Sequence, residues 1–573
     1  MGVPGLLGWL NSINKTKDSQ ADIYRNVKNS EEIAAYFVDM NSVLHDVAKI
    51  MPTFDLDGDD ITEYGTAVVT ALSTMLAKIK KPHNLVLCVD GAPPIAKLVD
   101  QRNRRYRSAA TPPVYEASFH ISVGTRFMYK LNSFLEQWIR NGGRNGDGLP
   151  LANTIIYSNH LVPGEGEFKI FELIRKGEIK DRGFFIIQGA DADLLIISVA
   201  LFNATNNEIL LHRPQQKKPH GFGGKQRGIG DFISGRALME LATKPLPFVL
   251  CLSFVGNDFI PTIPTTPAIP SVLDLILATS KKDVYKNIID HKTGEINWST
   301  LSILLSEMGG KEEVFLNDRT KYENFLVEGG KPKPQQQQTL FEEQDPTKKH
   351  QLLPGLEQKT YENFRTVWYK SGFSVTGSVT VSDNIIIDMC RCWLRMLQWC
   401  MRYYITGVHT EEYYPYRIAP TLRDLAAYIQ RVQNPKVEFG TPMVDRYPDP
   451  IHPLAQLACI IPPAYSHIIP DQLLSLVVND KTVSAFSDLL PKNVDIDRRG
   501  VFPKKDHTAK PILPPPDFNR WRDLVIILKK PPLFETLIKN ENILGIRIEP
   551  RLIVNPEFTV EESFDEILKE SKM

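Results

Sequence analysis

The sequence predicts an α/β fold: a mainly parallel β-sheet flanked by helices, followed by a largely helical second region packed against it. Two observations lead to this prediction. Over roughly the first 275 residues, short apolar runs bounded by polar residues or glycine alternate with helical patterns. After residue 360 the pattern is helical and punctuated by proline, with aromatic clusters such as WLRMLQWCMRYY. Continuous apolar runs are typical of strands buried on both faces, as in parallel sheets.

Four apolar runs are the predicted strands of this sheet. They lie at residues 34–40, 84–90, 153–158 and 183–193. Between them, segments such as 61–81 and 167–177 have the apolar spacing of helices. The alternation predicts strands joined by helical crossovers.

Length and composition divide the chain further. A chain of 573 residues is too long for one compact core. Residues 329–358 are rich in Gln, Pro and Lys, which predicts a linker or disordered insertion. We therefore expect a first region at 1–328, this linker, a second region at 359–530 and a C-terminal tail at 531–573. Residues 213–230 predict a mobile basic loop.

The bulk composition is that of an ordinary soluble protein, with 42% hydrophobic and 23% charged residues. Lys plus Arg and Asp plus Glu both number 67, so any case for nucleic-acid binding must come from local patches. Six sparse cysteines, mostly in apolar runs, predict buried thiols in a reducing compartment. No apolar run approaches the roughly 20 residues that span a bilayer. We expect an intracellular protein without membrane contact.

Seven carboxylates occupy places where they can meet. Parallel strands end at one edge of a sheet, where ligands bind, so acids that follow several strands converge in one crevice. Two more acids stand at the start of a predicted helix, and another follows the apolar run 248–256. The seven are Asp39, Asp90, Asp191 and Asp193 after strands, Glu165 and Glu167 at the helix start, and Asp258.

Such a cluster needs protons or cations to offset its repulsion. Oxygen-only ligands select hard ions, meaning Mg²⁺ or Mn²⁺. Two such ions about 4 Å apart suit phosphodiester hydrolysis. A single Asp after a strand is more often a turn or helix cap, but capping does not account for seven acids in these positions.

A cationic helix face follows Asp90 closely and should border the crevice. Lys97, Gln101, Arg104 and Arg105 are spaced at i, i+4, i+7 and i+8, which places them on one side of a helix. Arg can bind phosphate with two hydrogen bonds, so this face predicts a phosphate receptor. The alternative is an ordinary solvated basic face.

The motifs resemble a known family, the Xrn-type 5′→3′ exoribonucleases, which are distant relatives of the flap endonucleases. The matching blocks occur in the family's order: MGVPGLLGWL, VDMNSVLH, CVDGAPPIAKLVDQRNRRYR, VPGEGEFKI, QGADADLLI and FVGNDFIP. Further along, YYPYRIAP and PLAQLACIIPPAYSHIIP resemble its second conserved region. The resemblance covers most of residues 1–275 and much of 360–500. It implies that the first region is catalytic and that the second supports the active site.

The resemblance also implies roles for individual residues. The seven acids would be catalytic and bind two Mg²⁺ ions, with Mn²⁺ able to substitute. Lys97, Gln101, Arg104 and Arg105 would hold the 5′-monophosphate of single-stranded RNA, so that hydrolysis releases nucleoside 5′-monophosphates. His45 would stack on the first base, and Asn41 would assist near the scissile phosphate. We expect a monomer in the cytoplasm, with a nuclear location left open.

Two departures from the family pattern stand out. Before YYPY the family commonly has a Trp that sandwiches the base, whereas this chain has HTEE at 409–412. Tyr413, Tyr414 or another aromatic residue could take its place, or stacking could be one-sided. Val123 and Arg126 stand where the family usually has Pro and Glu. The large C-terminal extension of the cytoplasmic members is also missing, which suggests a compact member.

Two other functions compete with this one. A flap-type, structure-specific DNA nuclease would share the strand-end acids, but it typically has a Glu-Ala-Glu block where this chain has Glu-Gly-Glu at 165–167. A non-catalytic RNA-binding scaffold could retain the fold, but the complete acid set argues against it.

Overall fold

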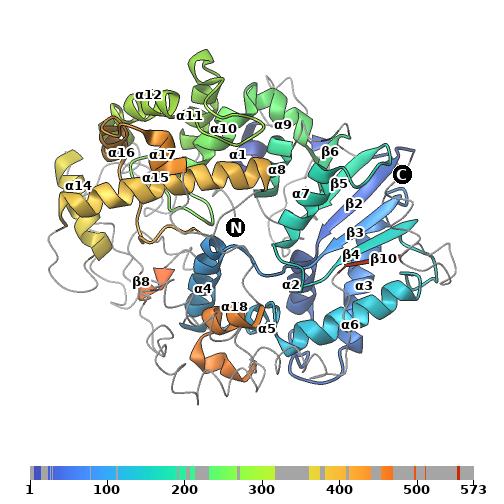
Figure 1. Ribbon diagram of the computed structural model, residues 1–573. Coiled ribbons are helices and arrows are strands. Elements are labelled where there is room, and N and C mark those ends of the chain that lie inside the picture. The colour runs from blue at the N-terminus through green and yellow to red at the C-terminus, as the bar shows by residue number, and fades with distance from the viewer. Residues whose placement is uncertain are drawn as a thin grey trace, which may run out of the picture.

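The computed structural model has a sheet with helices on both faces, on the right in Figure 1, and a second group of helices beside it. The structure describes residues 6–13, 24–25, 27–28, 30–77, 79–110, 114–189, 193–201, 205, 207–212, 232–266, 271–316, 361–373, 381–407, 412–440, 453–468, 496–497, 510–511 and 551–554. The predicted basic loop at 213–230 and the predicted linker at 329–358 lie outside the described residues.

The eight strands of the main sheet run in the order β1-β7-β6-β5-β2-β3-β4-β10. Their bounds are β1 Tyr24–Arg25, β2 Ile33–Asp39, β3 Asn84–Cys88, β4 Thr154–Ser158, β5 Phe184–Gln188, β6 Ile209–His212, β7 Phe232–Ser234 and β10 Arg551–Val554. The central strands from β6 to β4 are parallel, whereas β1, β7 and β10 pair antiparallel at the two edges. The predicted mainly parallel sheet is therefore confirmed, with antiparallel edges that the sequence analysis did not anticipate.

Helices cover both faces of the sheet because successive strand residues point to opposite sides. Phe37, Val86 and Ile187 face one hydrophobic cluster, and their neighbours Val38 and Leu87 face another. The helices and 3-10 turns of this region are α1 Leu6–Ile13, α2 Met40–Ile50, α3 Thr62–Leu76, α4 Ile95–Ala110, α5 Ala117–His120, α6 Arg126–Arg140, α7 Gly166–Lys176, α8 Asp193–Leu201, α9 Gly235–Ala242, α10 Pro245–Leu252, η2 Ser253–Val255, α11 Ser271–Ser280, η3 Asp283–Tyr285 and α12 Trp298–Gly309.

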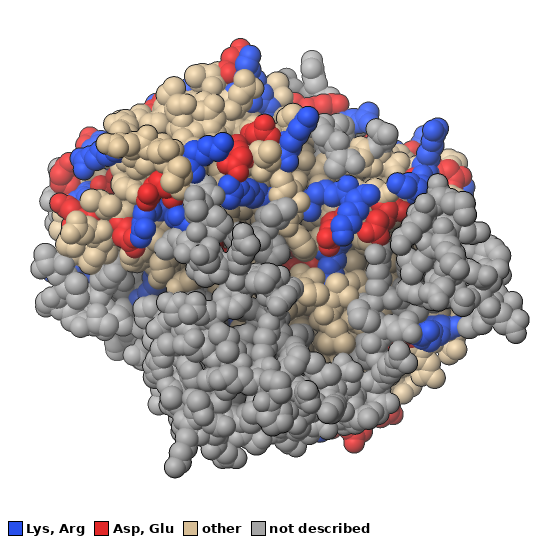
Figure 2. Space-filling model, viewed as in Figure 1, with Lys and Arg blue, Asp and Glu red and all other residues tan. Residues whose placement is uncertain are grey.

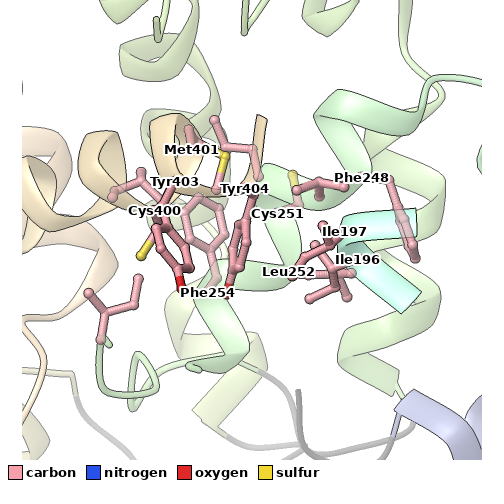
Figure 3. Packing of buried hydrophobic residues seen from close by; sticks show 14 of the residues in the cluster. Ile196, Ile197, Phe248, Cys251, Leu252, Phe254, Cys400, Met401, Tyr403 and Tyr404 are labelled. Carbon is pink, nitrogen blue, oxygen red and sulfur yellow. The ribbon is translucent and has the colours of Figure 1, made fainter. Parts of the chain in front are cut away.

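The second region is helical, as predicted, and shares a core with the first. Its elements are α14 Tyr361–Phe373, α15 Asp383–Thr406, α16 Leu422–Ile429, α17 Pro435–Gly440, α18 Pro453–Ile460 and the 3-10 turn η6 Pro463–Ile468. Figure 3 shows Tyr403 and Tyr404 of α15 beside Phe254 of η2, with Cys251 and Leu252 of α10 close by. One hydrophobic cluster therefore joins the two regions and packs α15 against the region of the sheet.

Two short pairings lie further along the chain. β8 Ile496–Asp497 pairs antiparallel with β9 Lys510–Pro511, and β10, within the predicted tail, pairs antiparallel with β4. β10 thus covers what would otherwise be an unpaired edge of the sheet. Among the described helices none alone is long and apolar enough to cross a bilayer; one bent pair, Gly235–Ala242 with Pro245–Val255, passes by length and composition only.

Candidate active site

Asp39 and Asp90 stand at the carboxyl ends of neighbouring parallel strands. Asp39 is the last residue of β2 and caps α2, because its side chain accepts a hydrogen bond of 3.2 Å from the Asn41 backbone N–H. Asp90 follows β3, and its two carboxylate oxygens accept from the Asn41 amide and the Gly166 backbone N–H, each at 2.7 Å. Asn41, predicted to assist near the phosphate, thus contacts Asp90 directly and orients it.

Glycines bring the loop after β3 against the start of α7. The Gly91 N–H donates to the Gly164 carbonyl, and the Gly164 N–H donates to the Ala92 carbonyl, both at 2.8 Å. A Cβ on Gly91 would lie 1.7 Å from the Val162 carbonyl oxygen, so the approach requires glycine. This pairing carries the start of α7, with its two glutamates, to the ends of β2 and β3.

Gly166, between the two glutamates, packs against the acids themselves. A Cβ there would lie 2.8 Å from the Cys88 carbonyl oxygen, 3.1 Å from Asp39 Oδ1 and 3.4 Å from Asp90 Oδ1. The Glu-Gly-Glu block therefore has a steric reason in this fold, because alanine would press on both the β3 backbone and the carboxylates.

Lys97, on the first turn of α4, joins two further acids. Its buried ammonium lies 2.8 Å from Glu165 Oε1 and 2.6 Å from Asp258 Oδ2. Although burial opposes the charged forms, the lysine holds the pKa of Asp258 below its ordinary value, and the carboxylates raise the pKa of Lys97. Asp258 follows η2, so it reaches the crevice from a helical element rather than from a strand end or helix start.

Glu165 is the acid whose negative charge its neighbours compensate least. Burial, with the nearby charges of Asp90 and Asp258 adding to it, raises its pKa to about 7 despite Lys97. Its Oε2 atom is buried and has no hydrogen-bond donor among the described residues. An orphaned carboxylate oxygen among other carboxylates fits a hard divalent cation such as Mg²⁺ or Mn²⁺, which takes oxygen ligands.

The remaining acids are described only in part. Glu167 is buried in the first turn of α7 and acts electrostatically on Lys97. Asp193 is the first residue of α8, and its side chain is not described; Asp191 lies outside the described residues.

The predicted phosphate-binding residues lie on one helix, α4, but have different partners. Lys97 contacts the acids, and the buried Gln101 amide oxygen accepts from Gln456 Nε2 of α18 at 3.1 Å. Arg104 Nε lies 2.8 Å from Asp100 Oδ2. Arg105 donates to the Ser122 hydroxyl at 2.7 Å through Nη2, and it makes no salt bridge with an acid of the described ranges.

Burial and repulsion weaken the charge of this end of α4. Burial lowers the pKa of Arg105 to about 9, and the neighbouring charge of Arg104 contributes to the decrease. Burial also lowers the pKa of His45 to about 4, with the positive charge of Arg105 adding to the effect. A phosphate would supply an anion for Arg105, while His45 with its lowered pKa stays neutral near pH 7.

His45 has an aromatic neighbour that the sequence analysis missed. Its Nδ1 lies 3.3 Å from the Tyr115 hydroxyl, which donates to the His45 carbonyl at 3.1 Å, and the ring centroids are 5.8 Å apart. Tyr414, one of two suggested substitutes for the family's Trp, is buried in the core and donates to the Ile418 carbonyl. Tyr413 is partly buried against that core, and the ring that the structure places next to His45 is that of Tyr115.

Charge elsewhere is mixed. Figure 2 shows Lys and Arg interspersed with Asp and Glu over the described part of that face, as the balanced composition leads one to expect. The described part of this face thus shows no broad basic surface, and the cations of α4 remain the predicted anion-binding feature.

Two family models match the chain. The model of the XRN 5′-3′ exonuclease N-terminus matches residues 1–117 and 114–212, and the model of the Xrn1 helical domain matches residues 359–504. The chain belongs to the XRN family of 5′-3′ exonucleases. The first match ends at the sheet strand β6 and the second begins just before α14, so each model corresponds to one of the two regions of the fold.

Curated relatives within the XRN family are similar over most of this chain. The 5′-3′ exoribonuclease 2 homolog of Drosophila melanogaster is 23% identical over 87% of the chain and 68% of its own length. The 5′-3′ exoribonuclease 1 of Homo sapiens is 26% identical over 84% of the chain, and that of Saccharomyces cerevisiae is 23% identical over 81%. The chain spans only 32% and 39% of the lengths of these last two proteins.

One buried cation beneath the XRN acid cluster was not predicted. Lys169 of α7 donates to the Val89 carbonyl at 2.6 Å and to the Asn159 carbonyl at 2.8 Å. It thereby ties the loops after β3 and β4 to α7, just beneath Asp90, and burial lowers its pKa to about 8. Its position two residues after Glu167 was the only pattern that could have drawn attention to it.

The structure places the two departures from the family pattern near residue 125 away from the acids, so the chemistry of the acids does not explain them. Val123 is buried in the turn between α5 and α6, where apolar packing suits valine. Arg126 begins α6, is exposed and, after Lys130, helps to lower the pKa of Asp59. Both residues therefore belong to the surroundings of α5 rather than to the crevice.

Proposed function

We propose that this chain is a 5′→3′ exoribonuclease that hydrolyses 5′-monophosphorylated single-stranded RNA to nucleoside 5′-monophosphates with two Mg²⁺ ions. The observation that carries the proposal is the adjacency of two features through α4. Its first turn places Lys97 among the acids, and its third turn carries Arg105, which donates to the Ser122 hydroxyl and the Gln101 carbonyl and pairs with no acid of the described ranges. An anion-binding end and a cation-binding end thus share one rigid element.

The acid cluster would hold the metal ions. Asp39, Asp90, Glu165 and Asp258 supply the oxygens that the structure describes, and Glu167, Asp191 and Asp193 complete the proposed set. When bound, the two ions would activate water and stabilise the leaving oxygen of the phosphodiester. Asn41 orients the Asp90 carboxylate, and Lys97 keeps Glu165 and Asp258 close together by offsetting their repulsion.

The 5′ end of the RNA would be read by the far end of α4. Arg105, with Arg104 and Gln101, would bind the terminal phosphate, and His45 would lie against the first base. A monophosphate fits a site with few cations, whereas a cap or triphosphate adds bulk and charge. One nucleotide between this site and the acids would make the enzyme release mononucleotides.

A flap-type DNA nuclease is the first alternative. The match of the second region to an XRN helical domain and the packing that excludes a side chain at Gly166 support the RNA enzyme instead. A non-catalytic scaffold is the second alternative, and the orphaned oxygen of Glu165 in a cluster of acids argues against it.

The proposal is tested with one RNA prepared with a 5′-monophosphate, a 5′-triphosphate or a 5′-hydroxyl, in Mg²⁺ or in chelator. We expect only the monophosphorylated RNA to disappear rapidly, with mononucleotides as the product and no activity in chelator. Preferential cleavage of flapped DNA would favour the DNA nuclease, and the absence of Mg²⁺-dependent cleavage of any substrate would favour the scaffold.

A further inference from the structure

Three side chains from distant parts of the chain meet on the outer side of α5. Asp57 comes from the loop after α2, His120 is the last residue of α5, and His467 lies in η6 of the second region. His120 Nε2 lies 3.1 Å from Asp57 Oδ1, and His467 Nε2 lies 4.0 Å from Asp57 Oδ2. All three groups place one donor atom within 4.8 Å of the others.

The hydrogen-bond partners of His120 require one more positive charge than a neutral imidazole supplies. Its Nδ1 lies 3.2 Å from the Glu116 carbonyl oxygen, which only accepts, so Nδ1 carries a hydrogen. Its Nε2 faces the Asp57 carboxylate, which also only accepts. A neutral imidazole has one N–H and cannot serve both, so either a second proton or a metal ion belongs between Nε2 and Asp57.

We propose that Asp57, His120 and His467 form a binding site for a divalent transition metal of the Zn²⁺ type. Two imidazoles and one carboxylate suit Zn²⁺ and its neighbours, not Mg²⁺. Around a tetrahedral Zn²⁺, ligand atoms lie roughly 3.3 Å apart, so only His467 has to approach by a small side-chain rotation. The carbonyl of Glu116 orients His120 in the way that backbone carbonyls commonly orient metal-binding histidines.

The electrostatic surroundings favour a cation. The same loop carries Asp55, Asp59 and Asp60, and Lys130 is paired with Asp59 rather than with Asp57. His120 is nearly buried, with 5% of its side chain exposed, whereas Asp57 and His467 are 61% and 56% exposed. A metal ion could therefore enter from solvent and bind a fixed inner ligand.

Such an ion would join the second region to the first. The same junction already holds a stacked pair, Phe119 of α5 and Tyr465 of η6, with ring centroids 4.1 Å apart. α5 is flanked by Tyr115, the neighbour of His45, and Ser122, the partner of Arg105. If the proposed function holds, the ion would also steady the segment that lines the 5′-end site.

The test measures Zn²⁺ binding and does not involve RNA. Isothermal titration of the full chain with Zn²⁺ is carried out with Mg²⁺ in large excess, so that the acid cluster is occupied. Asp57→Asn and His467→Ala alter exposed ligands and should leave the fold intact. His83→Ala is the matched control, because His83 also lies near two carboxylates, those of Glu32 and Asp181, but outside the cluster.

We expect one Zn²⁺ site that is at least tenfold weaker in Asp57→Asn and in His467→Ala and unchanged in His83→Ala. Zn²⁺ should also raise the Tm of the wild type and of the control but not that of the two ligand variants. Equal Zn²⁺ binding by wild type and ligand variants, or none by the wild type, overturns the proposal and leaves a proton between His120 and Asp57. Both results are independent of exonuclease activity.

Discussion

The two ends of α4 carry buried cations in opposite situations. At the first turn Lys97 lies between two carboxylates, at 2.8 and 2.6 Å, which raise its pKa well above the ordinary value in spite of burial. Two turns later Arg105 has a hydroxyl and a backbone carbonyl as partners, and burial lowers its pKa to about 9. One helix therefore holds one cation whose charge the protein neutralises and one whose charge it does not.

The difference separates two tasks on a single rigid element. Lys97 organises the acids and leaves the Glu165 Oε2 atom for a cation. Arg105 has no ion-pair partner within the described ranges, and in the proposed function the RNA phosphate supplies the anion. If the proposed function holds, the spacing between phosphate binding and hydrolysis is set by the rise of the helix, about 1.5 Å per residue.

The largest effect should come from the acid end of α4, where Lys97 lies among the carboxylates. Asp90→Asn keeps an oxygen that can accept from the Gly166 N–H but removes the negative charge beside Asn41. We expect kcat to fall by at least about 100-fold with an unchanged Tm, since losing a metal ligand exceeds the 10- to 100-fold cost of losing its supporting contacts. Asp283→Asn, at an exposed ion pair with Lys244, is the control. A near-normal kcat in Asp90→Asn would remove Asp90 from the metal site.

Arg105→Gln tests the phosphate end of α4, which Arg104 and Arg105 form. A hydrogen bond to a charged group contributes about 1.5–3 kcal/mol, so we expect KM for 5′-monophosphorylated RNA to rise roughly 10- to 100-fold. KM for 5′-hydroxyl RNA should hardly change, because that end offers no phosphate. Arg107→Gln, elsewhere on the same helix, is the matched control. An equal loss on both RNAs would mean that Arg105 supports the fold rather than the phosphate.

Local patterns in the sequence were enough to predict β3 and α4, the two elements on which the Asp90 and Arg105 predictions rest. Residues such as Leu85 and Val86 could only form a buried strand, which fixed Asp90 at its carboxyl end. The spacing of Lys97, Gln101 and Arg105 predicted a helix, and α4 spans all three. Both inferences use the periodicity of side chains along one element, and that information is present in the sequence itself.

What the sequence could not provide is the partner of each side chain across the fold. Lys97 meets Asp258, which is 161 residues further along, and His45 meets Tyr115 rather than Tyr413 or Tyr414. The edge strand β10 pairs with β4 from nearly 400 residues away. These contacts depend on how loops and helices pack, and no local spacing encodes that packing.

Gly166→Ala tests the steric side of the acid end. The added methyl would lie 2.8 Å from the Cys88 carbonyl oxygen, so it should push α7, and Glu165 with it, away from Lys97. Overpacking of this kind costs about 1–3 kcal/mol, which should appear as a lower Tm and weaker Mg²⁺ binding. Gly146→Ala, where a Cβ meets no atom within 4 Å, should change neither. A normal Tm and normal Mg²⁺ binding would show that α7 can shift freely.

The pH dependence of Mg²⁺ binding tests the charge of the acid end. The folded-state pKa of Glu165 is about 7, above its ordinary 4.5, so the metal-free fold keeps a proton that the unfolded chain has lost. Stability of the metal-free protein should thus fall as pH rises through this window. Mg²⁺ must displace that proton, so its Kd should weaken up to about tenfold per pH unit below 7.

Thermal shift with and without Mg²⁺ at pH 6, 7 and 8 measures both effects. Glu312→Gln is the control, because burial also raises the pKa of Glu312 to about 7, but its carboxylate accepts from the first backbone N–H groups of α16, away from the acids. This variant should alter the metal-free slope and leave the Mg²⁺ dependence intact. A Mg²⁺ Kd independent of pH would mean that Glu165 is already ionised in the metal-free protein.

The smallest effect should come from the neighbour of His45, the residue that would lie against the first base. Tyr115→Phe keeps the ring beside His45 but removes the hydroxyl that donates to the His45 carbonyl. One neutral hydrogen bond contributes about 0.5–1.5 kcal/mol, so KM should rise only a few-fold with kcat unchanged, whereas Tyr115→Ala should cost more. Tyr428→Phe removes a comparable hydroxyl contact, to Glu438 in the second region, and should be silent. If Tyr115→Ala is silent too, His45 holds its position without Tyr115, and the arginines alone define this end of α4.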